Sequence, residues 1–416
     1  MSKILAIDIG NGTTDIILYD SSKNIENSIK IVMPTPSRRY LQELEAIDFT
    51  GSQKILIHGS TIGGGPLAHE LIHIAREGKA SVTMTRNAAF TIRNDMDEVA
   101  SFGIKIIDEP DLMGIVPSGR QSHDSNVVVN SEDIFMIFQE LEFPFLSSFF
   151  ERLGEDLSLL DGICVCAQDH GICKKEISDR LNRFSEFEKI LKRGGTSPAG
   201  TRPEDERPAR KNAGASAGSD AHMPTPYSFC FDKNTIPEKF YRLKSLASRI
   251  SSFLPSCPML IMDSSPAALL GCFAYAEEYR ELNKKKLREP YLMVNMGNNH
   301  AIFVVAREEK ILAFYEHHTW AYEEDPEKLE KHIKRFCDGE LPSSEIFDDE
   351  GNGSLYFDPP GFDKIKNIIV TGPNRDIFRK TSLKVHYASL GGDMMMTGPL
   401  GMVRAFKKIH EGETGK

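Results

Sequence analysis

Two Gly/Asn turns with the same internal spacing lie near opposite ends of the sequence and carry the residue types that hold phosphate. Residues 5–18 read LAIDIGNGTTDIIL, and residues 292–305 read LMVNMGNNHAIFVV. Apolar and β-branched residues flank both turns, which predicts a strand, a tight turn and a second strand in each copy. Bare backbone N–H groups and small hydroxyls in such turns bind phosphate oxygens. Two facing turns would therefore grip a nucleotide tail from both sides.

The first turn is preceded by a carboxylate, Asp8. A carboxylate at this point can hold Mg²⁺ through water, because this cation prefers hard oxygen ligands. We therefore predict a metal site at Asp8. The phosphates are expected to contact the residues of the two turns, which are Gly10, Asn11, Gly12, Thr13 and Thr14 in the first and Gly297, Asn298 and His300 in the second.

The second turn differs from the first at two positions that matter for chemistry. Asn295 stands where the first copy has Asp8, and an amide can donate to phosphate but cannot serve as a charged Mg²⁺ ligand or as a base. His300 matches Thr13 and either donates to phosphate or caps the turn. Both roles stay open at this point. Any catalysis needs a carboxylate from elsewhere in the chain.

The two turns and five other segments are together similar to the actin-like ATPase-domain superfamily, which includes Hsp70, hexokinases and sugar kinases. More narrowly, the sequence resembles an uncharacterised family of that superfamily, whose members are often labelled putative pyruvate formate-lyase activating enzymes. The resemblance implies a two-lobed, ribonuclease H-like α/β fold with duplicated mixed sheets, flanking helices and an interlobe cleft that binds Mg-ATP. The segments that carry it are 6–15, 59–66, 167–171, 263–268, 294–300, 316–319 and 371–375.

Two further carboxylates receive catalytic roles from this resemblance. Asp263 ends a predicted strand and precedes Ser-Ser-Pro, like the catalytic Asp of glycerol and xylulose kinases, and QDHG at 168–171 is similar to a Gln-x-His-Gly segment of those enzymes. The resemblance implies that Asp263 takes the proton from the attacking hydroxyl and that Asp169 positions water or metal. The alternative is that Asp263 only caps the following helix.

A Gly-Pro-Asn-Arg segment at 372–375 follows another predicted strand. By the same resemblance it is the adenosine-side loop, in which Gly372 and Asn374 contact the nucleotide. A plain helix start, with Pro373 in its first turn, explains the same residues.

The predicted strands and helices fall into two similar halves, residues 1–172 and 227–416, each with a hairpin, a third strand and alternating strands and helices. Within the first half, residues 131–153 are predicted to form one helix. Residues 193–226 between the halves are rich in Gly, Pro, Ala, Ser and mixed charges. We expect a disordered insertion there, because few large apolar groups can offset the entropy of ordering.

Two short motifs suggest other chemistry. HELIH at 69–73 is an H-E-x-x-H match, which on a helix would place His69 and His73 on one face as zinc ligands of a hydrolase, with Glu70 as the base and Glu98 as a possible third ligand. A chance match is the alternative. The C-x-x-x-C-x-x-C spacing of a radical iron–sulfur site is not matched by the three clustered cysteines, Cys164, Cys166 and Cys173.

Composition narrows the class of protein further. A net charge of −10 argues against a nucleic-acid binder. The apolar stretch 258–276 is interrupted by polar residues, and no signal peptide is recognisable, so we expect a cytoplasmic protein without a membrane span. Seven irregularly spaced cysteines fit a reducing compartment. The predicted function is an ATP-dependent phosphotransferase acting on a small hydroxylated substrate, or an ATPase; the alternative is a non-catalytic nucleotide sensor acting on a protein partner.

Overall fold

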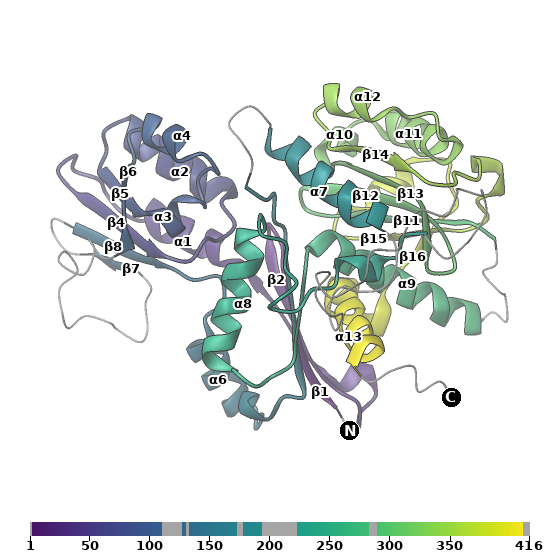
Figure 1. The fold of residues 1–416 in the computed structure, drawn as a ribbon, viewed down its shortest axis with the longest axis horizontal. Helices are drawn as coiled ribbons and strands as arrows, with labels where there is room; N and C mark the ends of the chain where they lie inside the picture. Colours follow the sequence, from purple (N-terminus) through teal and green to yellow (C-terminus); the bar gives the residue numbers. More distant parts are fainter. Residues whose placement is uncertain are drawn as a thin grey trace, which may run out of the picture.

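Three β-sheets with helices on their faces make up this mixed α/β protein (Figure 1). The structure is a computed structural model. Within the part of the chain that it describes, no helix combines the length and the apolar character needed to cross a bilayer. The described residues are 2–109, 127–129, 133–172, 178–193, 223–282 and 289–410.

The first sheet contains the first Gly/Asn turn and has the strand order β10-β9-β1-β2-β3. Strand β1 pairs antiparallel with β2 and parallel with β9, and the β1–β2 register places Asp8 opposite Asp15. The bounds are β1 (Lys3–Ile9), β2 (Thr13–Asp20), β3 (Ile29–Pro34), β9 (Gly162–Ala167) and β10 (Met259–Met262).

The second sheet repeats this arrangement around the second turn, with the order β14-β13-β12-β11-β15-β16. Strand β11 pairs antiparallel with β12 and parallel with β15, as β1 does with β2 and β9. An equivalent backbone hydrogen bond closes each turn. Gly10 N donates to Thr13 O in the first turn, and Gly297 N donates to His300 O in the second, each at 2.9 Å. The bounds are β11 (Tyr291–Met296), β12 (His300–Arg307), β13 (Lys310–His318), β14 (Gly353–Tyr356), β15 (Ile368–Thr371) and β16 (His386–Tyr387).

A third sheet is inserted between β3 and β9 and stands on the left of Figure 1, with the order β6-β5-β4-β8-β7. Its strands are β4 (Lys54–Gly59), β5 (Ser81–Thr85), β6 (Lys105–Ile107), β7 (Val127–Val129) and β8 (Asp133–Phe138). Its helices are α1 (Pro36–Glu45), α2 (Gly65–Arg76), α3 (Arg86–Ala89) and α4 (Met96–Ser101).

The single helix predicted over 131–153 is wrong in its first part. Residues Asp133–Phe138 form strand β8, in which Ile134, Met136 and Phe138 are buried and alternate with partly buried neighbours. This period of two is typical of a strand, and it outweighs the helical spacing that continues into the next segment. Helix α6 (Phe143–Arg152) begins only at Phe143, with a proline in its first turn.

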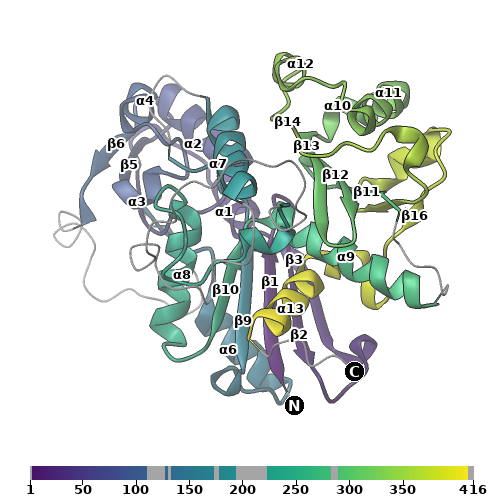
Figure 2. The same cartoon turned by 45° about the vertical axis from the view of Figure 1, so that its right-hand side comes forward.

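Two long helices lie between the first and second sheets (Figure 2). Helix α9 (Ser264–Leu282) follows β10 and packs against β11 and β15, and also reaches β1 and β9. Helix α13 (Thr397–His410) follows the last strand of the second sheet, yet packs against β1, β2 and β9 of the first. The helices cross at Gly271 and Gly401, where a Cβ on Gly401 would lie 2.3 Å from Gly271 N.

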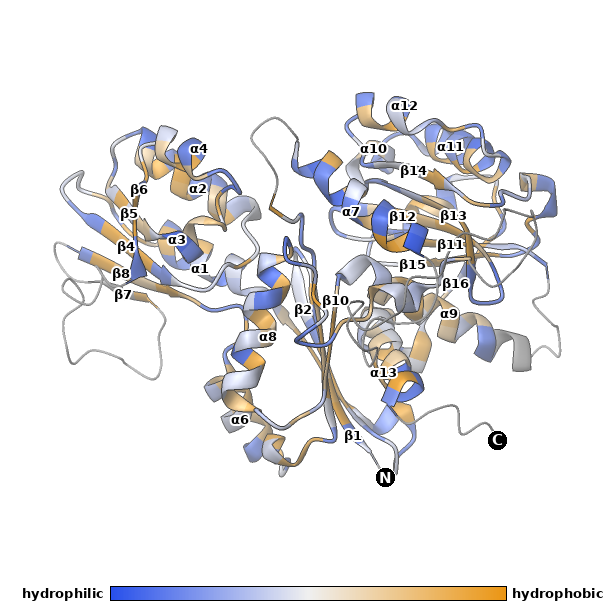
Figure 3. Ribbon diagram, viewed as in Figure 1, coloured by the Kyte–Doolittle hydropathy of each residue, from blue (hydrophilic) through white to orange (hydrophobic). Residues whose placement is uncertain are grey.

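The strands of the sheets are coloured mostly as hydrophobic in Figure 3, whereas the helices carry both hydrophobic and hydrophilic residues. One buried cluster belongs to the third sheet, one to the outer side of the second sheet, and the largest joins the first sheet to its neighbours. The remaining α-helices are α7 (Asp179–Arg193), α8 (Tyr241–Phe253), α10 (Trp320–Glu323), α11 (Pro326–Asp338) and α12 (Ser343–Asp348).

The predicted division at 172 and 227 stays a prediction. Strand β10 lies C-terminal of that division but pairs with β9 in the first sheet. The predicted disordered insertion, 193–226, falls mostly on residues 194–222, which lie outside the described residues.

Candidate functional site

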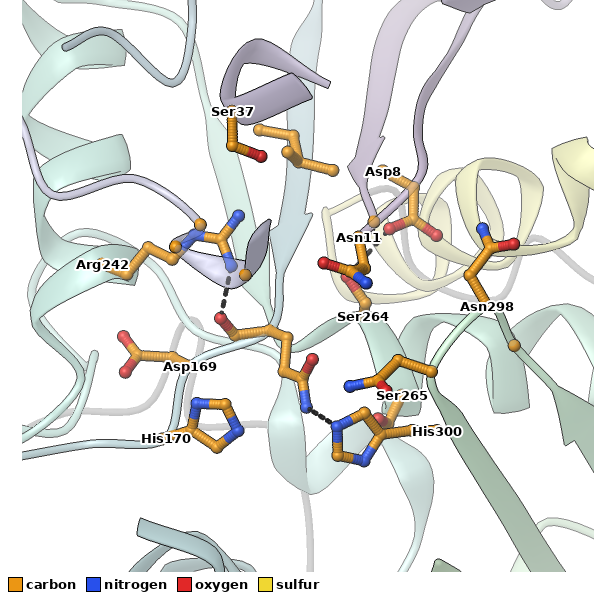
Figure 4. Close-up of a pocket in the computed structure, with 18 of the residues that line it drawn as sticks. Asp8, Asn11, Ser37, Asp169, His170, Arg242, Ser264, Ser265, Asn298 and His300 are labelled. Carbon is orange, nitrogen blue, oxygen red and sulfur yellow. Dashed lines mark hydrogen bonds between the residues drawn. The ribbon is translucent and has the colours of Figure 1, made fainter. Parts of the chain in front are cut away.

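A cavity of about 420 Å³ lies where segments of all three sheets meet, and both Gly/Asn turns line it. Asn11 and Asn298 face the same space as Asp8 (Figure 4). A Cβ on Gly12 would lie 2.7 Å from Asn298 Nδ2, so the two turns are in contact at their tips. The cavity lining includes six of the predicted turn residues, namely Gly10, Asn11, Thr13, Gly297, Asn298 and His300.

Three predicted nucleotide-binding residues, Gly12, Thr14 and Asn374, are not part of this lining. Thr14 is buried and its hydroxyl has no hydrogen-bond partner. Asn374 Nδ2 donates to Gly297 O at 2.8 Å, as does Thr319 Oγ1 at 2.8 Å. Asn374 therefore holds the backbone of the second turn in place rather than facing the cavity itself.

Gly372 does line the cavity, at the end of β15. Its φ is +96°, and a Cβ there would lie 2.2 Å from Met296 O. Both the backbone conformation and the close approach require glycine. After it, residues Arg375–Lys380 form a 3₁₀ helix.

Asp8 and Asp15 form a pair of neighbouring carboxylates at the cavity wall. Ser264 Oγ donates to Asp8 Oδ1 at 2.9 Å, and burial raises the pKa of Asp8 to about 6. Asp15 is 7% exposed, and its Oδ1 has no hydrogen-bond partner. Burial, followed by the charge of Asp8, raises the pKa of Asp15 to about 8.

This pair fits a hard divalent cation. Its donors are all oxygens, and one buried carboxylate oxygen is left unsatisfied, which normally indicates a missing partner. Among the described residues, no group of three or more His, Cys, Asp or Glu side chains could hold a metal. A cation here would therefore complete its coordination with water and with oxygens of a bound phosphate.

Replacing Asp15 by Asn should stabilise the metal-free protein at alkaline pH. In the folded protein Asp15 keeps its proton up to a pKa of about 8, whereas in the unfolded chain it releases the proton near pH 4. Folding stability therefore falls as the pH rises between these values. The advantage of Asp15→Asn over wild type should grow by more than about 1.4 kcal/mol from pH 5 to pH 8. Urea denaturation at both pH values, in chelator, measures it; an equal difference at both would contradict the burial argument.

Asp263 does not line the cavity. Arg183 on helix α7 donates from Nη1 to Asp263 Oδ2 at 2.6 Å and from Nη2 to Oδ1 at 2.8 Å. The backbone N–H groups of Asp169 and Ser265 also donate to this carboxylate, both at 3.0 Å. Both oxygens of Asp263 are thus engaged, which suits a structural carboxylate better than a free base.

Arg183 connects the first sheet to the second. Its side chain is fully buried, and its Nε donates to Glu316 Oε1 on β13 at 3.2 Å. The aromatic ring of Phe187 lies under the guanidinium, 4.4 Å from Cζ. Our sequence analysis missed Arg183. Its only signal is an arginine on the apolar face of a helix, next to Phe184 and four residues before Phe187.

Asp169 lines the cavity beside Arg242 (Figure 4). Asp169 Oδ1 accepts from Gly171 N at 2.9 Å and Oδ2 from Leu243 N at 3.1 Å, so the carboxylate holds the first turn of helix α8. Burial raises the pKa of Asp169 to about 6. Arg242, which the sequence analysis also missed, forms a two-pronged ion pair with Glu140 at 2.8 and 2.9 Å.

Three histidines gather beside the second turn. His300 is 8% exposed and lines the cavity, with His170 facing it (Figure 4). The ring of His300 lies 6.3 Å from that of His170 and 4.6 Å from that of His318. Burial lowers the pKa of His170 and of His318 to about 4 in each case. Both flanking rings are therefore neutral at physiological pH.

Within the described part of the chain, the H-E-x-x-H residues and Glu98 are not part of any group of three or more His, Cys, Asp or Glu side chains that could hold a metal. His69 is exposed and lines the cavity, whereas His73 Nε2 lies 3.0 Å from Lys79 Nζ. Glu98 forms an ion pair with Arg93 at 3.4 Å.

The clustered cysteines give no cluster site within the described part of the chain. Cys164 and Cys166 are buried free thiols in β9, and burial raises the pKa of both. Cys173 lies outside the described residues.

Comparison with known proteins gives a family. A family model described as "Putative pyruvate format-lyase activating enzyme (DUF1786)" matches residues 62–211 and 219–377. A search of the curated proteins found no match. The matched ranges cover well over half of the 416 residues and include strands β5 to β8 of the third sheet, the second turn and Gly372. The chain belongs to this family.

Proposed function

We propose that the protein binds Mg-ATP between the two Gly/Asn turns and uses it either to phosphorylate a small hydroxylated substrate or to hydrolyse ATP. One observation carries the proposal. The two turns, each closed by an equivalent backbone hydrogen bond, line one cavity and are in contact at Gly12 and Asn298. Paired backbone N–H groups in such turns suit the β- and γ-phosphates.

The repeated sheets support an actin-like, two-lobed arrangement. The strand order is equivalent around the two turns: it is β3-β2-β1-β9 in the first sheet and β13-β12-β11-β15 in the second, with the last pair parallel in each. A cavity between two such repeats is the place where that superfamily, which the sequence resembles, binds its nucleotide. Gly372, at the cavity wall beside the second turn, is in a position to meet the adenosine.

Asp8 would hold Mg²⁺, with Asp15 next to it on the paired strand. Bound there, the cation would neutralise charge on the phosphate oxygens as phosphoryl transfer proceeds. The residues themselves supply the remaining functions. The turn amides would position the phosphates, and Asn374 and Thr319 hold the Gly297 carbonyl. Gln168 and His300 line the cavity and would meet the γ-phosphate.

Thermal unfolding with and without nucleotide tests the proposal. ATP with Mg²⁺ should stabilise the wild-type protein by about 2.7 kcal/mol at a free concentration of 100 Kd. Asp8→Asn should lose the Mg²⁺-dependent part of this shift. Asp376→Asn is the matched control, because Asp376 is an exposed carboxylate paired with Arg379 outside the cavity. No shift of the wild type with any nucleotide would refute nucleotide binding.

A non-catalytic nucleotide sensor is the second candidate. It is favoured by Asn295, an amide at the position that matches Asp8, and by the engagement of Asp263 with Arg183. ADP release measured against a library of hydroxylated metabolites separates the two. If the protein binds ATP but releases no ADP with any of the metabolites, the result favours the sensor.

A further inference from the structure

We infer that His300, oriented by Glu316, is the general base of this site and acts on a hydroxyl group, either of water or of an alcohol. The inference rests on the proposed function, because ATP is the phosphoryl donor in the reaction that it serves. It gives His300 a role beyond the phosphate contact or turn cap that its place in the sequence predicts.

The carboxylates near the cavity are poorly placed to take this proton. Both oxygens of Asp263 accept from Arg183, and Asp263 lies outside the lining. Asp169 lines the cavity, but each of its oxygens accepts a backbone N–H. Asp8 lies with Asp15 at the proposed cation site. Asp179 also lines the cavity, and its Oδ1 accepts from Asn94 Nδ2 at 3.0 Å. A side chain other than these carboxylates is therefore the better candidate for the proton acceptor.

Glu316 determines which nitrogen of His300 carries a proton. Burial alone raises the pKa of Glu316, but Arg183 and His300 outweigh burial and lower it to about 2. The carboxylate is therefore charged, and its Oε1 lies 3.2 Å from His300 Nδ1. A lone pair on Nδ1 would face this charge at close range, so Nδ1 carries the proton and Nε2 the lone pair. The contact is out of line for a hydrogen bond, as is common in catalytic pairs without substrate.

The surroundings of Nε2 agree with this assignment. Gln168 Nε2 lies 2.7 Å from His300 Nε2, and an amide N–H can donate to a nitrogen lone pair. The backbone of Gln168 is fixed, because its carbonyl accepts from Arg242 Nη1 at 2.7 Å. Rotation of its side chain would let a substrate O–H take the place of the amide N–H.

The step balances as follows. The acceptor oxygen forms a bond to the γ-phosphorus of ATP while its proton passes to His300 Nε2. The bond between the γ-phosphorus and the bridging oxygen breaks, and ADP leaves with that electron pair. His300 then carries a positive charge, which Glu316 stabilises, and it releases the proton to solvent after the product departs.

The charged and titratable groups that face this ring come from three elements. His170 follows β9, Glu316 and His318 lie on β13, and Arg183 on α7 contacts Glu316. His170 and His318 are neutral and Glu316 is ionised across the neutral range.

Three variants test the inference by steady-state ADP release in the full-length protein. His300→Gln should lower kcat by about 10² to 10⁴-fold, with little change in KM for ATP or in the ATP-dependent thermal shift. Glu316→Gln should lower kcat by at least about tenfold. His318→Gln, the matched control, removes a neighbouring imidazole outside the cavity lining and should retain activity.

Nitrogen NMR of the imidazoles provides a readout that does not depend on turnover or on the folding of Glu316→Gln. In wild type the signals of His300 should show a protonated Nδ1 and an unprotonated Nε2. The opposite tautomer, or a His300→Gln kcat near that of wild type, would overturn the inference. If the wild-type protein binds ATP but does not turn it over, the inference is also wrong, although the proposal of nucleotide binding still holds. If ATP does not shift the thermal unfolding of the wild-type protein, the proposed function itself is refuted.

Discussion

Replacing Arg183 by methionine is expected to lower the free energy of unfolding by about 3–5 kcal/mol, because it leaves two buried carboxylates without their cation. Asp263 is 2% exposed and Glu316 fully buried, and Arg183 contacts both. Removing one member of a buried ion pair is costly even where the intact pair contributes little. Urea denaturation of wild type and variant at pH 7 measures the change.

A paired replacement and a surface control make this prediction specific. Arg183→Met combined with Asp263→Asn should recover at least about 1 kcal/mol, because one of the stranded charges is gone. Arg335→Met removes a two-pronged ion pair with Glu345 on an exposed helix face and should cost no more than about 1 kcal/mol. If Arg183→Met lowers the free energy of unfolding no more than Arg335→Met does, leaving the two buried carboxylates without Arg183 does not carry the expected cost.

Alanine at Gly271 is expected to destabilise the protein by about 3 kcal/mol or more, at the upper end of overpacking costs. A Cβ at this position would lie 2.0 Å from Thr397 O and 2.6 Å from Thr397 Cγ2, so helices α9 and α13 would have to move apart. The backbone atoms involved cannot rotate away as a flexible side chain would. The midpoint of thermal unfolding and the soluble yield both report this change.

Gly154→Ala is the control that separates crowding from backbone strain. Gly154 has a φ of +81° and open space around its Cβ position, so alanine there should cost only about 1 kcal/mol. Equal effects at Gly154 and Gly271 would mean that the helix crossing tolerates a methyl group.

The local parts of the fold could be predicted from the sequence, whereas the parts made by distant contacts could not. Both Gly/Asn hairpins follow from apolar runs around a turn, and the structure contains both. The strand at Asp133–Phe138 was mistaken for helix, because a short apolar run carries both periodicities and only its pairing with β4 decides between them.

The same limit applies to the candidate site. The turn residues could be named in advance, because their chemistry lies in the turns themselves. The ion pair of Arg183 with Asp263 and Glu316 joins residues 80 and 133 positions apart, and no local pattern marks it. The unsatisfied oxygen of Asp15 is likewise visible only once β2 is buried against its neighbours. Resemblance alone pointed to Asp263 as a base, and the packing of helix α7 argues for a different role.

Helix α13 follows the last strand of the second sheet in the sequence but packs against the first sheet. The helix therefore links the two sheets, which bears on how they can move relative to each other. Helix α9 follows β10 of the first sheet but also packs against β11 and β15 of the second, so separating the two sheets would break packing made by both helices. Separating the two sheets would have to open the close contact of α9 and α13 at Gly271 and Gly401, whereas a rotation about this crossing would keep it. We therefore expect any relative motion of the sheets to be a small rotation.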